Sequence, residues 1–180
     1  MPAERPAVFF DRDGTLIHEA NYCSHPSQVR AFEGAPEALQ KLADAGFAIV
    51  IVTNQSGIGR GYFTHDDFRR VQEETLRQLA PAVITATYYD DSHPGAPSPR
   101  RKPSPLMVEE AAAEHGLDLT RSFLVGDKVS DIECGQRAGL RTVLVETGYG
   151  KDHFECGADA VVPDIAAAAD WILQEATWLR

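Results

Sequence analysis

The chain has 180 residues, 43% of them hydrophobic, which is enough to build one globular domain around a sizeable core. Its formal net charge of −10 at pH 7 argues against a nucleic acid or an anionic membrane surface as its main partner. No apolar run approaches the roughly 18 residues that a membrane span requires.

Short apolar runs alternate with segments of helical periodicity along the chain. In chain order this pattern predicts strand 7–10, helix 35–46, strand 47–52, helix 64–79, strand 83–89, helix 104–115, strand 122–125, helix 130–138, strand 142–145, a short edge strand 159–162 and helix 165–173. Such alternation is typical of a three-layer α/β fold, in which helices cover both faces of a central parallel sheet. We expect residues 1–180 to form a single domain that binds its ligand beyond the carboxyl ends of the strands.

The end of the first predicted strand carries the most informative motif. Asp11 and Asp13 follow the apolar run directly, and Gly14 comes next. Two like charges at the end of a buried strand repel each other and are costly to remove from water. A cation that prefers oxygen ligands, such as Mg²⁺, would neutralise them. The glycine lets backbone amides turn toward an incoming anion.

A parallel sheet would bring further polar segments to the same edge. Two of them follow the second and fourth predicted strands, and another lies in the loop 90–105, which is rich in Pro, Ser, Gly and Arg. The candidates are Thr53, Asn54, Lys102, Asp127, Lys128 and Asp131. Each alone is compatible with a turn, a helix cap or a solvated lysine. Their joint occurrence in this order indicates one site.

With these four segments the chain resembles the haloacid dehalogenase-like phosphatases. The motifs that carry the resemblance are residues 11–15, Thr53, Lys102 and the pair Asp127 and Asp131. The match covers about residues 7–150. It implies a Rossmann-like sheet, a required Mg²⁺ and an aspartyl-phosphate intermediate.

The resemblance implies a role for each acidic residue. Asp11 would attack phosphorus as the nucleophile. Asp13 would protonate the leaving oxygen and then deprotonate the water that attacks the intermediate. The carboxylates of Asp11 and Asp127 and the backbone carbonyl of Asp13 would hold the Mg²⁺. Asp131 would orient Lys102 or a metal-bound water.

The other motif residues would bind the oxygens of the transferring phosphoryl group. These are the Thr53 hydroxyl, the Asn54 amide and the Lys102 ammonium. Lys128 would add positive charge near the metal, although an exposed lysine is an equally good interpretation. The gaps between the motifs are too short for a large cap domain, so we expect an open site.

The loop 54–64, which contains three glycines and Arg60, narrows the resemblance further. Together with residues 21–22 and Arg101 it resembles the D-glycero-D-manno-heptose 1,7-bisphosphate 7-phosphatases. The resemblance implies hydrolysis of a phosphate monoester of a small sugar in carbohydrate metabolism, toward lipopolysaccharide. Arg60 and Arg101 would grip the distal phosphate, because the arginine fork matches phosphate oxygens. The alternatives are a histidinol-phosphate phosphatase and a non-catalytic phosphosugar-binding module.

The chain departs from that family in the loop before the lysine, where relatives usually hold a structural zinc. Asp90 and Ser92 stand in place of a Cys-x-His pair, and Ser98 and Arg100 stand in place of a Cys-x-Cys pair. A zinc site with one histidine and no thiolate is not credible. We therefore expect Mg²⁺ as the cofactor and no structural Zn²⁺.

The cysteines indicate the compartment. Cys23, Cys134 and Cys156 are odd in number and far apart, which predicts free thiols in a reducing environment. The first strand follows a short N-terminal segment without a signal-peptide pattern. We expect a cytoplasmic monomer that binds a small phosphorylated sugar and neither nucleic acid nor membrane.

Overall fold

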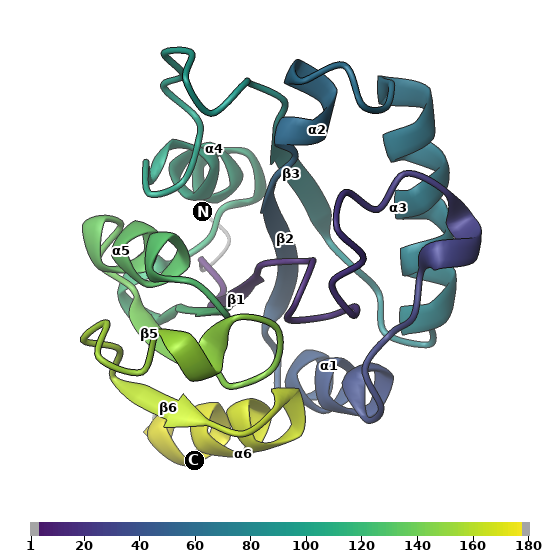
Figure 1. Cartoon of the computed structure of the whole chain (residues 1–180). Helices are drawn as coiled ribbons and strands as arrows, with labels where there is room; N and C mark the ends of the chain where they lie inside the picture. The colour runs from purple at the N-terminus through teal and green to yellow at the C-terminus, as the bar shows by residue number, and fades with distance from the viewer. Residues whose placement is uncertain (1–3, 178–180) are drawn as a thin grey trace.

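A parallel sheet of six strands forms the centre of the protein, in a computed structural model that describes residues 4–177 (Figure 1). The strands are β1 (Ala7–Phe10), β2 (Ala48–Asn54), β3 (Ala86–Asp90), β4 (Phe123–Gly126), β5 (Arg141–Val145) and β6 (Ala160–Val162). Their order in the sheet is β3-β2-β1-β4-β5-β6, and each neighbouring pair is parallel. The predicted α/β architecture is confirmed.

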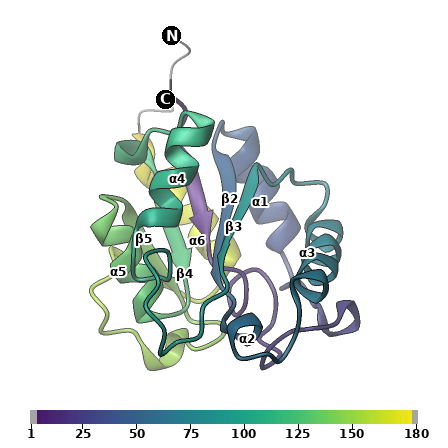
Figure 2. The ribbon, with the colours of Figure 1, turned by 90° about the horizontal axis from the view of Figure 1, so that it is seen from above.

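Helices cover both faces of this sheet. They are α1 (Ala35–Asp44), α2 (Ser56–Gly59), α3 (His65–Leu79), α4 (Leu106–His115), α5 (Val129–Arg137) and α6 (Ile165–Glu175). Successive strand residues point to opposite faces, so Val8 and Phe10 of β1 pack with α1, α3 and α6, whereas Phe9 packs with α4 and α5. Figure 2 shows α1 and α3 on one side of the sheet and α4 and α5 on the other.

Three differences from the predicted elements bear on the site. Thr53 belongs to β2 instead of following it, so the sheet itself fixes its backbone. The strand predicted over 83–89 begins only at Ala86, where β3 starts to pair with β2. Val83 lies outside the strand and is exposed. The loop 54–64 contains the short helix α2, which its glycines, poor helix formers, did not suggest.

The connections that approach the site are short. Between β1 and α1 the only helical turn is the 3₁₀ turn Pro26–Gln28, and residues 91–105 contain no helix or strand. Neither connection holds a large cap domain, as expected. Within residues 4–177, no helix combines the length and the apolar character needed to cross a membrane.

Candidate active site

The predicted site residues converge at the carboxyl edge of the sheet. Asp11 follows β1, Thr53 lies at the end of β2, and Asp127 follows β4. These residues lie close together because the three strands are parallel neighbours and end at the same edge of the sheet. A cavity of about 130 Å³ opens at this edge. It is lined by Asp11, Asp13, Thr53, Asn54, Ser56, Arg101, Lys102, Lys128, Ser130 and Asp131.

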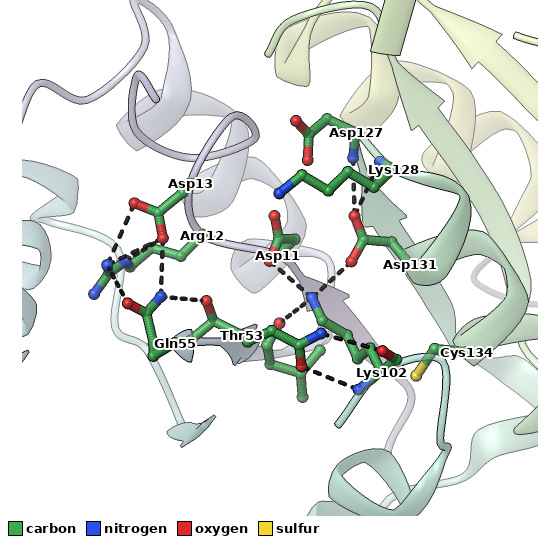
Figure 3. A network of polar contacts seen from close by, with 12 residues as sticks. Asp11, Arg12, Asp13, Thr53, Gln55, Lys102, Asp127, Lys128, Asp131 and Cys134 are labelled. Atoms are coloured by element: carbon green, nitrogen blue, oxygen red, sulfur yellow. Dashed lines mark hydrogen bonds and ion pairs between the residues drawn. The ribbon is translucent and has the colours of Figure 1, made fainter. Parts of the chain in front are cut away.

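Lys102 is the hub of the buried half of the site. Its ammonium donates to Asp11 Oδ1 at 2.7 Å, to Asp131 Oδ1 at 2.6 Å and to the Val52 carbonyl at 2.8 Å (Figure 3). These three bonds use all the protons of the group. Burial opposes its charge, but the carboxylates of Asp11 and Asp131 outweigh this and raise the pKa of Lys102. The lysine is therefore held permanently charged.

Asn54 fixes the backbone of this lysine. Its side-chain oxygen accepts from the Lys102 N–H at 3.0 Å, and its amide nitrogen donates to the Lys102 carbonyl at 3.2 Å. These two hydrogen bonds join the end of β2 to the loop after β3. The Asn54 amide donates one of its two N–H groups to the Lys102 carbonyl, and its predicted contact with phosphate stays a prediction.

Three buried carboxylates lie next to the lysine. One oxygen from each of Asp11, Asp127 and Asp131 lies within 4.8 Å of the others. Burial and the charge of Asp131 raise the pKa of Asp11 to about 6, although Lys102 opposes the shift. Burial and the charges of Asp11 and Asp131 raise the pKa of Asp127 to about 8. The negative charges of the three carboxylates outnumber the single positive charge of Lys102, as expected of residues that bind a divalent cation.

Asp127 carries the clearest sign of a metal ligand. Its Oδ1 is buried without a hydrogen-bond partner, while Oδ2 accepts from the Tyr149 N–H at 2.9 Å. A Cβ on Gly14 or on Gly148 would lie 2.2 Å from Oδ2. Two glycines with positive φ therefore leave room around this carboxylate. The donor set and the unpartnered oxygen fit Mg²⁺.

Asp131 differs from Asp127 because both of its oxygens are occupied. Oδ1 accepts from Lys102, and Oδ2 accepts from the N–H groups of Asp127 at 3.2 Å and Lys128 at 3.1 Å. Its contacts are those expected of a residue that orients Lys102. They also cap the first turn of α5, as the alternative interpretation of this motif proposed.

Asp13 belongs to a second network, separate from the lysine hub in Figure 3. Its carboxylate accepts from Arg12 Nε at 3.0 Å and from Gln55 Nε2 at 3.0 Å. Arg12 is fully buried, and its guanidinium lies 5.4 Å from the centre of the Phe68 ring. Sequence reasoning assigned no role to Arg12 or Gln55, because a polar side chain gives no local sign in the sequence that it is buried.

The remaining cations occupy different places. Lys128 lines the cavity, and the carboxylates around it raise its pKa although burial opposes this. Arg101 also lines the cavity, and its Nη1 is buried without a hydrogen-bond partner. Arg60 is exposed at the end of α2, with its guanidinium 6.0 Å from the centre of the Tyr22 ring. Arg60 lines neither this cavity nor the second cavity that adjoins it.

The second cavity is an outer cavity of about 190 Å³, which shares Asp13, Asn54, Ser56 and Lys128 with the inner one. The other residues that line it are Glu19, Asn21, Tyr22, Cys23, Gln55, Gly57 and Tyr149. Most of these residues are polar. The site therefore has an inner chamber with the charged groups and an outer chamber large enough for further polar parts of a ligand.

The loop that carries Lys102 is organised by a buried aspartate. The Asp90 carboxylate accepts from the backbone N–H and hydroxyl of Ser92 and from the hydroxyl of Ser98. Ser98 Oγ in turn accepts from the backbone N–H groups of Arg100 and Arg101. Residues at the positions of the family's zinc ligands thus form a hydrogen-bonded cluster, and the absence of zinc stays a prediction.

Comparison with known proteins gives consistent matches. Residues 8–90 match the family model described as haloacid dehalogenase-like hydrolase, and residues 99–168 match the one described as HAD-hydrolase-like. The chain is 40% identical to the D-glycero-D-manno-heptose-1,7-bisphosphate 7-phosphatase of Chlorobaculum tepidum, over 89% of this chain and 87% of that protein. The protein of the same name from Thermosynechococcus vestitus is 36% identical, over 93% and 95%.

A solved structure shares the fold closely. It is the D,D-heptose 1,7-bisphosphate phosphatase of B. bronchiseptica, which was crystallised in complex with magnesium and phosphate. The TM-score is 0.88 and the sequence identity 30%, and the match covers 94% of this chain and 99% of that chain.

Proposed function

This chain belongs to the haloacid dehalogenase-like hydrolases, in the family of heptose-bisphosphate phosphatases, and we propose that it removes the 7-phosphate of D-glycero-D-manno-heptose 1,7-bisphosphate. The observation that carries the proposal is the contact of Lys102 with Asp11 beside the unpartnered oxygen of Asp127. The proposed nucleophile, the lysine cation and the proposed metal ligand thus belong to one buried cluster. The substrate is the one that the relatives' names give.

In the first step a carboxylate oxygen of Asp11 bonds to phosphorus while the bond from phosphorus to the sugar oxygen breaks. Asp13 gives its proton to the departing oxygen. In the second step water attacks the aspartyl-phosphate, Asp13 takes a proton from that water, and inorganic phosphate leaves with Asp11 restored. The positive charge of Lys102 and a hydrogen bond from the Thr53 hydroxyl stabilise the phosphoryl oxygens in both steps.

Asp11, Asp127 and the backbone carbonyl of Asp13 would hold the Mg²⁺. Bound there, the ion would offset the repulsion between nucleophile and phosphate and polarise the phosphoryl oxygens. The raised pKa values of Asp11 and Asp127 support this assignment, because a cation restores both groups to the ionised form.

We assign the second phosphate of the substrate to Arg101. Its Nη1 is buried at the wall of the inner cavity without a partner, and an anion would satisfy it. Arg60 is less suited, since it lines neither cavity and lies on Tyr22. Replacing Arg101 by alanine should raise KM for the bisphosphate and leave KM for a sugar monophosphate unchanged. Arg60→Ala is the matched control and should leave both KM values unchanged.

The proposal is tested by incubating the purified protein with Mg²⁺ and the heptose bisphosphate and measuring phosphate release. Phosphorus NMR distinguishes loss of the 7-phosphate from loss of the 1-phosphate. We expect release from position 7 that disappears in Asp11→Asn. Release from position 1, or uniformly poor rates on all phosphorylated sugars, contradicts the substrate assignment.

One observation keeps histidinol phosphate as a second candidate. Glu19 places a carboxylate at the outer cavity, where it would attract the amine of that substrate. Its Oε1 already accepts from the Asn21 N–H at 2.8 Å, which leaves Oε2 free of that contact. A higher kcat/KM for histidinol phosphate than for the heptose bisphosphate favours this candidate. Binding of either compound without turnover favours a non-catalytic binding module.

We further propose that residues 1–180 act as one domain, and as a cytoplasmic monomer. The three cysteines are free, which suits a reducing compartment. The acidic net charge of −10 disfavours nucleic acids and anionic membranes as partners. Light scattering of the purified protein measures the assembly state directly.

A further inference from the structure

We propose that Gln55 is a positioning residue that orients the phosphoryl-binding hydroxyl of Thr53 and the carboxylate of Asp13 with a single amide group. The inference rests on the function proposed above. Gln55 Nε2 lies 2.8 Å from Thr53 Oγ1 and 3.0 Å from Asp13 Oδ2. Figure 3 shows the glutamine between these two groups and on the far side of Thr53 from the lysine hub.

Arg12 determines which end of the amide faces them. Its Nη2 donates to Gln55 Oε1 at 3.2 Å. A guanidinium has donors only, so the amide oxygen must face Arg12 and the NH₂ group must face Thr53 and Asp13. Arg12 cannot swing away, because it is fully buried and also donates to Gln72 Oε1 at 3.3 Å.

The backbone of Gln55 is anchored as well. Its N–H donates to the Asp90 carbonyl at 2.7 Å, which extends the pairing of β2 with β3 by one bond. The residue is only 5% exposed. The amide is therefore held in one place and one orientation before any ligand arrives.

This arrangement fixes the proton of the Thr53 hydroxyl. A hydroxyl has one proton to donate and two lone pairs that accept. The Gln55 N–H occupies one lone pair, so the hydroxyl proton cannot point at Gln55. Among residues 4–177, Thr53 Oγ1 has no other hydrogen-bond partner. The proton is left for an anion in the inner cavity, which Thr53 lines.

The second N–H of the same amide acts on Asp13. Together with Arg12 Nε it holds Asp13 Oδ2, and this carboxylate is turned away from Asp11 in Figure 3. Gln55 thus sets the starting orientation of the general acid as well as that of the hydroxyl. A change at Gln55 should alter phosphate affinity through Thr53 and kcat through Asp13.

A double-mutant cycle tests the part that acts through Thr53, with inorganic phosphate as the probe in the presence of Mg²⁺. Methionine at 55 keeps the length of the side chain and removes its hydrogen bonds. We expect Gln55→Met to weaken phosphate binding by about fivefold to tenfold, as for one lost hydrogen bond. In a Thr53→Val background the same change should have little effect. Equal losses in both backgrounds overturn the inference.

Gln55→Glu supplies the second measurement. It keeps the shape of the side chain, but its carboxylate can only accept hydrogen bonds. The carboxylate would therefore accept a hydrogen bond from the Thr53 hydroxyl and repel Asp13. We expect a larger loss of phosphate affinity and of kcat than in Gln55→Met. A space-filling role predicts the reverse order, and that result contradicts the inference.

Two controls separate the possible failures. Gln72→Met removes another glutamine bond to Arg12 without touching Thr53 or Asp13, and it should weaken phosphate binding less than Gln55→Met. Circular dichroism and thermal melts establish that each variant is folded. Thr53→Val with wild-type phosphate affinity refutes the proposed phosphoryl site itself, and with it the role of Gln55.

Discussion

The ammonium nitrogen of Lys102 lies 2.7 Å from a carboxylate oxygen of Asp11, although 91 residues separate the two in the sequence. Both side chains are almost completely buried. Without Lys102, Asp11 would be a buried charge beside Asp131 with no counterion, whereas Lys102 without Asp11 would still be paired with Asp131. The nucleophile of the proposed reaction thus depends on the lysine for its ionised state.

Lys102→Met should destabilise the protein by about 3 to 5 kcal/mol at pH 8, since it leaves Asp11 and Asp131 without their counterion. The loss should be smaller at pH 5, which lies below the raised pKa of about 6 of Asp11, so that this carboxylate takes up a proton. Urea unfolding at the two pH values measures the difference. Lys128→Met is the control and should cost less, because Lys128 is only partly buried. Equal stability of wild type and Lys102→Met at pH 8 contradicts the pairing.

Asp11→Asn should lower phosphate release by at least about 10³-fold, because the amide is not a nucleophile. The same change removes one negative charge from the neighbourhood of Asp127 and Asp131. The thermal midpoint measured without Mg²⁺ should therefore stay the same or rise. Loss of activity combined with unfolding would instead indicate a structural role, and near-normal turnover would exclude Asp11 as the nucleophile.

Mg²⁺ should stabilise the protein more at high pH. Asp127, with its pKa raised to about 8, and Asp11, with its pKa raised to about 6, carry protons below these values that a bound cation must displace. Without metal, the folded state binds more protons than the unfolded chain between about pH 4 and 8, so its stability falls as pH rises. Thermal melts from pH 5.5 to 9 with and without Mg²⁺ should show a growing shift, and a shift that shrinks with pH contradicts this.

Gly148→Ala should weaken Mg²⁺ binding strongly. Its Cβ would lie 2.2 Å from Asp127 Oδ2, and its φ of +57° also strains any other residue. Gly139→Ala is the matched control, because Gly139 has φ +76° but nothing within 4 Å of the added Cβ. Both variants should lose about 1 kcal/mol or more from backbone strain, whereas calorimetric titration should show weaker Mg²⁺ binding only in Gly148→Ala. Equal Mg²⁺ affinity in the two variants would rule out the carboxylate contact.

Metal analysis of the purified protein should find far less than one zinc per chain, and a chelator should not lower the thermal midpoint in Mg²⁺-free buffer. Asp90 and its two serines already hold the loop before Lys102. Asp90→Asn should therefore cost about 1 to 3 kcal/mol, because an amide nitrogen would face one of those hydroxyl donors. Stoichiometric zinc in this loop refutes the prediction.

Much of the fold could be predicted from local patterns. Continuous apolar runs located the sheet, because strands covered on both faces must be apolar throughout. The helix predicted over 64–79 corresponds to α3, for which Thr64 is the N-cap. The end of β2 was predicted two residues too early, since Thr53 and Asn54 were expected to follow the strand and instead belong to it. Residues 54–64 were predicted to form a loop, whereas the chain forms the short helix α2 within them.

The candidate site was only partly predictable. The acidic motif after β1 and the order of the other motifs indicated which residues share one edge, because parallel strands end together. Arg60 was predicted to bind phosphate; its guanidinium lies over the Tyr22 ring and lines neither cavity, and its role stays a prediction. Arg12 and Gln55 lie within segments that the sequence singled out, but nothing in the sequence assigned a role to either side chain.

The sequence by itself determined the parallel α/β sheet, the set of charged residues at its carboxyl edge and the family to which they belong, since these depend on hydrophobic periodicity and residue types. Only the tertiary structure decided which charges meet: Lys102 with Asp11 and Asp131, and Asp13 with Arg12. Such pairings depend on side-chain directions and on burial, which vary within a few ångströms. Neither spacing nor composition along a chain encodes distances of that size.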